Sequence, residues 1–104
     1  MTERSDEDLV SECRRGDRRA FDALIQRHQR TVFNLTLRMM RDPDDAADVT
    51  QSVFIKVYEK LGGFNERFKF FSWLYKIAVN ESLNALHQKK KFDGLNGVDV
   101  AAET

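Results

Sequence analysis

The residues best suited to chemistry lie in one stretch of the chain, from Gly62 to Lys91. A loop that starts with paired glycines carries aromatic and cationic side chains and leads into a helical pattern. At about 100° per residue, one narrow face of that helix collects cations, amides, an imidazole and an indole: Lys69, Trp73, Lys76, Asn80, Asn84, His87 and Lys91. Such nitrogen donors suit phosphates and exposed base edges, and aromatic rings suit stacking on unpaired bases. The stretch therefore predicts a surface that binds nucleic acid.

A second candidate surface lies on the helical segment just before this loop, from Pro43 to about Leu61. Its outer side is mostly acidic and polar: Asp44, Asp45, Asp48, Gln51, Ser52, Ile55, Lys56 and Glu59. Ile55 is apolar within a polar ring, as at the centre of a small protein interface. The alternative is an ordinary solvated helix face. For the aspartates near the start of the segment, compensation of the helix dipole is favoured over a cation site, so we expect no metal.

The spacing of apolar residues predicts an all-α domain that positions both surfaces. We expect a compact bundle of three main helices, at about 17–41, 43–61 and 70–91, plus a short N-terminal helix at about 6–15. Ser5, Asp17 and Asp42 are the expected N-caps, with Pro43 in the first position after Asp42. No segment alternates like a strand beside turn signals.

The formal net charge of zero hides an uneven distribution over the 104 residues. Residues 1–61 carry a net of −1, residues 62–92 a net of +4 and residues 93–104 a net of −3. A basic segment between acidic ones agrees with a local anionic partner. We expect one helical domain over residues 1–92 and an acidic linker or disordered tail over residues 93–104.

Catalysis has little support in the sequence. His28, His87 and Cys13 fall on three different predicted helices, and no recognisable nucleophile, zinc or phosphate-loop motif appears. We therefore expect no enzyme activity, no catalytic residue, no cofactor and no small-molecule substrate. His28 lies on an apolar stripe, which favours a packed, hydrogen-bonded histidine.

The single cysteine, Cys13, allows no internal disulfide, which agrees with a reducing compartment. The N-terminus is polar and acidic, unlike a secretory signal. No apolar run approaches the ~20 residues that span a bilayer. We expect a soluble cytoplasmic protein without membrane insertion.

Two segments taken together resemble conserved region 2 of bacterial sigma factors: DPDDAADVTQSVFIKVYEKLGGF and FFSWLYKIAVNESLNAL. The resemblance is strongest to the extracytoplasmic-function group, in its envelope-stress branch, and extends from about Leu9 to Lys91. It implies a bacterial protein that helps to initiate transcription. The family's second domain, the region 4 helix-turn-helix that reads the −35 element, is absent, so we expect a truncated or split protein.

The resemblance implies a partner for each surface. The acidic face would dock on the basic clamp helices of the RNA polymerase β′ subunit, through Asp45, Asp48, Gln51, Ser52, Ile55 and Glu59. The loop and the helix after it would capture the melted non-template strand of the promoter −10 element, with one base flipped into a pocket. The residues implied there are Phe64, Asn65, Arg67, Phe68, Lys69, Trp73, Lys76, Asn80, Asn84, His87, Lys89, Lys90 and Lys91. Phe64 and Phe68 could instead fill the core.

Some positions depart from the family pattern, namely Ala47, Ser52, Asn84 and His87. They leave the preferred promoter sequence open.

Members of this kind are typically held inactive by an anti-sigma factor, which is a further expected partner. Two other functions compete with this one: a helix-turn-helix repressor, and a helical protein-interaction module without DNA binding of its own. The aspartates after Pro43 argue against the repressor, because a recognition helix is basic or rich in amides.

Overall fold

The structure is a computed structural model that describes residues 4–97, with side chains up to residue 92. It contains α1 (Asp6–Arg14), α2 (Arg18–Met40), α3 (Pro43–Lys60), the short 3-10 helix η1 (Leu61–Gly63) and α4 (Phe70–Gly97). The described residues include no strand, and the predicted all-α bundle with a short N-terminal helix is confirmed. None of these helices is long and apolar enough to cross a membrane within the part of the chain that is described.

The helices begin at the predicted caps because each cap side chain satisfies free backbone N–H groups. Ser5 Oγ accepts from the Asp8 N–H at 3.0 Å, and the Asp8 carboxylate accepts from the Ser5 N–H at 3.4 Å, which completes a capping box. Asp17 caps α2 with a single bond, in which its Oδ1 accepts from the Arg19 N–H at 2.9 Å. Asp42 caps α3, with Pro43 in the first helical turn.

The end of α4 differs from the prediction. The helix continues to Gly97 instead of ending near Lys91, so the first residues of the expected linker, 93–97, have helical backbone. No proline follows Pro43 in the chain, and each of the two glycines in this stretch, Gly94 and Gly97, costs a helix only ~1 kcal/mol. Residues 98–104 of the expected tail lie outside the described residues.

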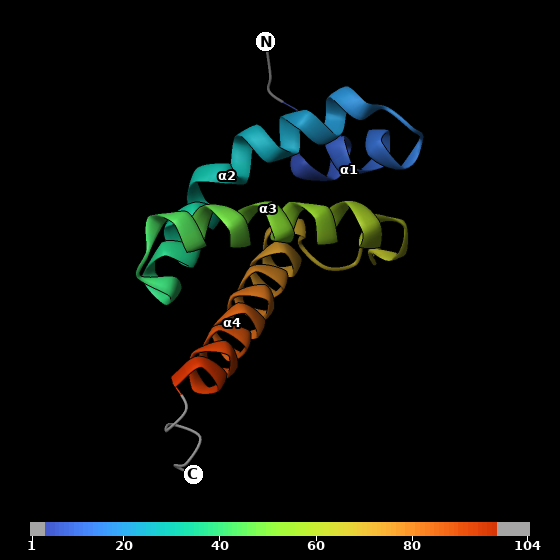
Figure 1. The fold of residues 1–104 in the computed structure, drawn as a ribbon. Coiled ribbons are helices and arrows are strands. Elements are labelled where there is room, and N and C mark those ends of the chain that lie inside the picture. Colours follow the sequence, from blue (N-terminus) through green and yellow to red (C-terminus); the bar gives the residue numbers. More distant parts are fainter. Residues whose placement is uncertain (1–3, 98–104) are drawn as a thin grey trace.

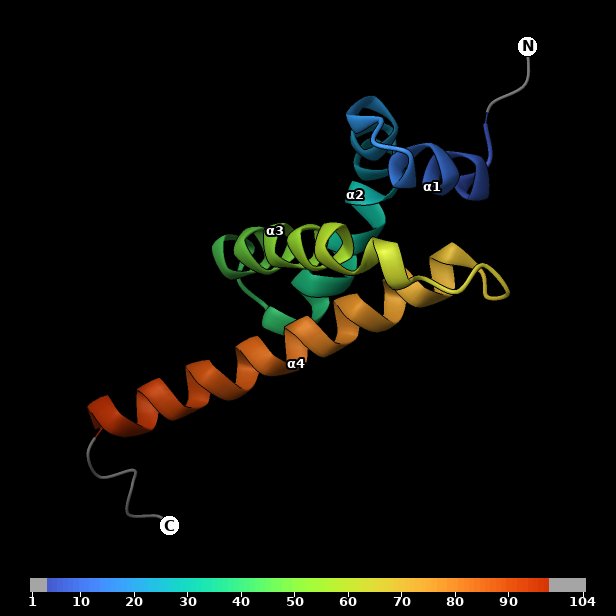
Figure 2. The same ribbon diagram turned by 90° about the vertical axis from the view of Figure 1, so that its right-hand side faces the viewer.

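The four helices enclose one core. The most extensive contact is between α2 and α3, and α4 packs against both of them, while α1 packs against α2 (Figure 1). The buried apolar side chains come from every helix: Leu9, Val10, Leu24, Val32, Leu35, Val53, Val57, Phe70, Leu74 and Ala78. The C-terminal part of α4 projects beyond the other helices (Figure 2).

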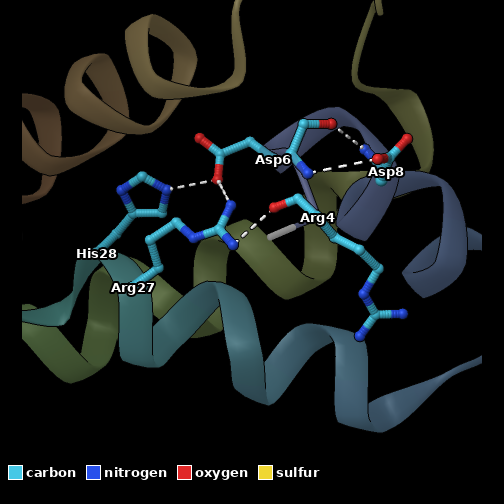
Figure 3. Close-up of polar contacts among 6 residues, drawn as sticks. Arg4, Asp6, Asp8, Arg27 and His28 are labelled. Carbon is cyan, nitrogen blue, oxygen red and sulfur yellow. Dashed lines mark hydrogen bonds and ion pairs between the residues drawn. The ribbon is translucent and has the colours of Figure 1, made fainter. Parts of the chain in front are cut away.

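A polar cluster joins α1 to α2 (Figure 3). Asp6 Oδ1 lies 2.9 Å from both His28 Nε2 and Arg27 Nη1, and Arg27 Nη2 donates to the carbonyl of Arg4 at 2.7 Å. His28 is buried, and its ring centre lies 5.7 Å from that of Phe70 on α4. The predicted packed, hydrogen-bonded His28 is confirmed. The cluster therefore ties the start of α1 to the middle of α2.

Candidate nucleic-acid interface and acidic docking face

Phe64 anchors the loop between η1 and α4 to the core. This ring is only 3% exposed, and its centre lies 4.8 Å from that of Trp73 and 5.9 Å from that of Phe70. The predicted contact of Phe64 with DNA is therefore corrected, because a buried ring has no free face on which a base could stack. Its ring packs against that of Trp73, which is half-buried at the edge of the core.

The tip of the same loop is turned outward. Asn65 Oδ1 accepts from the Arg67 N–H at 2.9 Å, and the Asn65 carbonyl accepts from the Phe68 N–H at 3.0 Å, which closes a tight turn. Arg67, Phe68 and Lys69 are exposed as a result, and Phe68 reaches 64%. Of the two loop phenylalanines, Phe64 is therefore buried in the core and Phe68 is exposed to solvent.

The predicted donor stripe of α4 lies at the surface. Its exposed members are Lys69, which directly precedes α4, and Lys76, Asn80, Asn84, His87 and Lys91 on the helix; the neighbouring Lys90 is exposed as well. The opposite side of α4 supplies core residues such as Phe70, Leu74 and Ala78. The helix therefore packs with one face and presents amide, ammonium and imidazole groups on the other.

Lys89 differs from its lysine neighbours. Its Nζ lies 2.7 Å from Asp45 Oδ2 near the start of α3. The pair joins one residue of the expected nucleic-acid surface to one of the expected docking face. Both side chains are partly exposed, so solvent screens the attraction between them.

The outer face of α3 is formed as predicted. Asp48, Gln51, Ser52 and Glu59 are all exposed, and Ile55 is 53% exposed among them. An apolar side chain that is more than half exposed in this position lies outside the buried core. Asp45 is less accessible, because its carboxylate is turned toward Lys89.

A groove of about 800 Å³ between α2 and α3 borders this face, and the sequence did not predict it. Its apolar lining comes from Phe21, Ile25, Phe54, Ile55 and Tyr58, and the rings of Phe21 and Tyr58 meet edge to face at 5.1 Å. Tyr58 is 60% exposed although it follows the apolar spacing of α3. No separate apolar stripe marks the groove in the sequence, because Phe21 and Ile25 fall at helical spacing with the core residue Leu24.

A family model, Sigma-70 region 2, matches residues 24–92, from the first half of α2 into α4. The chain belongs to the sigma-70 region 2 family. Within this family, the RNA polymerase sigma-H factor of Pseudomonas aeruginosa is 42% identical over 86 residues, which cover 83% of this chain and 45% of the relative. Further relatives are named as extracytoplasmic-function (ECF) sigma factors, the predicted group. This sigma region 2 domain spans less than half the length of the curated relatives it matches.

Two solved structures share the fold of this sigma region 2 domain. An engineered region 2 of sigmaE, determined by NMR in complex with GTAAAA, has a TM-score of 0.81 and 40% identity, covering 88% of this chain and 96% of that chain. CnrH, in complex with the cytosolic domain of CnrY, has a TM-score of 0.71 and 26% identity, covering 76% of this chain and 51% of that one.

Proposed function

We propose that this sigma region 2 domain docks on core RNA polymerase and captures the melted non-template strand of a promoter −10 element, and so helps to initiate transcription. The observation that carries the proposal is the exposed donor stripe of α4 beside the outward-turned tip of the loop. Asn80 and Asn84 supply amides for a base edge, and Phe68 supplies a ring for stacking. The basic residues Arg67, Lys69, Lys76, His87, Lys90 and Lys91 flank them.

Capture of an open strand supplies the energy for melting. Unstacking one base costs a few kcal/mol. An aromatic contact returns ~1–3 kcal/mol per base, and phosphate contacts add a term that weakens with salt. Phe64 contributes indirectly, because its buried ring packs against the half-buried Trp73. The role needs binding alone, without bond chemistry, a cofactor or a small-molecule substrate.

The engineered region 2 of sigmaE supports the choice of ligand, because that protein was solved in complex with GTAAAA. Its identity of 40% extends over nearly all of its own length. A related donor surface on this domain is therefore expected to take a −10-like strand. The departures at Asn84 and His87 bear on which bases it prefers.

The polymerase contact is assigned to α3. The β′ clamp helices are basic in this family, so they suit the exposed carboxylates of Asp48 and Glu59. Ile55 supplies an apolar centre, and Gln51 and Ser52 supply a polar rim. The groove between α2 and α3 adds apolar area beside this face.

An anti-sigma factor is the further partner we propose, and the bacterial cytoplasm is the proposed place of action. The structure of CnrH supports the proposal of a protein partner, because CnrH was solved in complex with the cytosolic domain of CnrY. We propose that residues 1–92 form the region 2 domain and that residues 93–104 are an acidic linker or tail.

Two measurements on the whole 104-residue chain test the proposal. The first compares binding of a −10-like single strand with binding of the same sequence as a duplex, at two salt concentrations. Single-strand preference that weakens with salt supports the proposal, whereas duplex-only binding would support the repressor. The second is a pull-down with core polymerase. If neither DNA nor polymerase binds, the protein-interaction module becomes the better explanation.

A further inference from the structure

The loop that presents Arg67, Phe68 and Lys69 is held from outside by one side chain of α1. Arg14 Nη2 donates to the carbonyl of Gly62 at 2.9 Å, and Arg14 Nη1 lies 2.7 Å from Glu66 Oε2. These partners lie 48 and 52 residues further along the chain. One planar guanidinium therefore joins the beginning of the loop to its tip.

The beginning of the loop needs such a constraint because it contains two glycines. A Cβ at Gly62 or Gly63 would meet nothing within 4 Å, and neither glycine has a positive φ. Space and backbone geometry therefore do not demand glycine here. What glycine adds is conformational freedom, and that freedom must be limited if the tip is to keep one shape.

The other restraints on the loop act elsewhere. Leu61 and Phe64 are buried and fix its inner side, and Asn65 closes the turn at the tip. Neither restraint joins the glycines to Glu66. Arg14 alone does so among the contacts of the described residues.

Arg15 offers a natural comparison. It is the next residue, carries the same charge and is exposed, but its side chain has no hydrogen bond or ion pair with any residue between 4 and 92. The family model begins at residue 24, so Arg14 at the end of α1 and Arg15, which follows it, lie outside the segment that this model matches.

We propose that Arg14 is a positioning residue for strand capture, which holds the loop of residues 61–69 in the shape that accepts DNA and does not itself contact DNA. The inference rests on the proposed function. If the capture-competent shape is populated only in part without Arg14, the apparent affinity falls in proportion to that population.

The test uses the 104-residue chain and a labelled −10-like single strand, with Arg14→Ala, Arg15→Ala and Glu66→Gln as variants. Arg14→Ala should weaken binding about threefold to tenfold, with an unchanged slope of log K against log salt. Arg15→Ala should weaken binding less than twofold. Glu66→Gln removes a negative charge, which would tighten binding if relief of Coulomb repulsion from the phosphates were the only effect. Loss of the ion pair with Arg14 predicts weaker binding instead.

A second readout needs no DNA. Backbone order parameters from NMR report fast motion of residues 65–68 in the free protein, and we expect them to fall in Arg14→Ala but not in Arg15→Ala. Equal effects of the two arginine variants on binding would overturn the proposal. So would a fall of about 0.7 in the salt slope for Arg14→Ala, which is the signature of a lost phosphate contact on a single strand. If the unmodified chain does not bind the strand, the proposed function fails. Separately, unchanged order parameters of residues 65–68 in Arg14→Ala would refute the proposal that Arg14 holds the loop in shape.

Discussion

The ammonium of Lys89 lies 2.7 Å from the carboxylate of Asp45, so the two predicted binding surfaces meet in one ion pair. Lys89 is on α4 and Asp45 is in the first turn of α3, 44 residues apart in the chain. The pair fixes the C-terminal half of α4 against the start of α3. It also means that a cation proposed to hold DNA faces an anion proposed to hold polymerase.

Asp45→Asn should therefore strengthen single-strand binding by the isolated chain. An exposed ion pair contributes ~0.2–1 kcal/mol, which corresponds to a gain of about 1.5-fold to fivefold at low salt. The gain should vanish when the same change is made together with Lys89→Ala. A gain that persists in the double variant would mean that general charge, and not this pair, is responsible. Fluorescence anisotropy at two salt concentrations makes the measurement.

Asp48→Arg should abolish association with core polymerase while the domain stays folded. The new cation would face the basic clamp helices without a partner, and like charges across an interface cost several kcal/mol. A pull-down measures association, and circular dichroism checks the fold. Glu7→Arg, on α1, is the matched reversal outside the docking face and should leave association intact. Unchanged association of Asp48→Arg would remove α3 from the proposed interface.

Asn80→Ala should weaken single-strand capture about fivefold, because one amide hydrogen bond contributes ~1 kcal/mol. The side chain is exposed, so thermal stability should change little. Gln88→Ala removes an exposed amide from the same helix outside the donor stripe and is the control. If Asn80→Ala unfolds the domain, the residue has a structural role and the assignment fails.

Ser82→Ala should leave stability unchanged or raise it by up to ~1 kcal/mol. Ser82 Oγ is fully buried without a hydrogen-bond partner among the described residues, and an unsatisfied polar group costs stability. Thr36→Val is the contrasting change. Thr36 Oγ1 lies 2.9 Å from Thr50 Oγ1 and 3.2 Å from the Ala46 carbonyl, so its loss should destabilise the fold by ~1–2 kcal/mol. Urea denaturation distinguishes the two, and a clear loss of stability in Ser82→Ala would contradict the prediction.

Cys13 should react slowly with iodoacetamide near neutral pH. Partial burial raises the pKa of its thiol above the ordinary value, and the nearby carboxylates of Asp17, Glu12 and Asp22 raise it further. The thiolate is the nucleophile, so alkylation should accelerate as the pH rises beyond the usual thiol range. Because burial is the largest cause, unfolding in urea should restore reactivity more than Asp17→Asn does. Rapid alkylation of the folded chain at neutral pH would refute this environment.

The sequence by itself determined the local features of this protein. Helix starts follow from Ser5, Asp17 and Asp42, because a cap bonds to backbone groups only two or three residues away. The donor stripe of α4 follows from helical periodicity, which places residues three and four apart on one face. The burial of His28 follows from its place on an apolar stripe.

Only the tertiary structure decided the features that depend on distant partners. Phe64 and Phe68 are the same residue type in one loop, yet one is buried and the other exposed, because Phe64 packs against Phe70 and Trp73 whereas Phe68 lies in the turn closed by Asn65. The contacts of Arg14 with Gly62 and of Lys89 with Asp45 join residues more than forty positions apart. Helical periodicity indicates which way a side chain points on its own helix. The residue that it meets depends on how the helices pack, and that packing minimises the free energy of the whole domain.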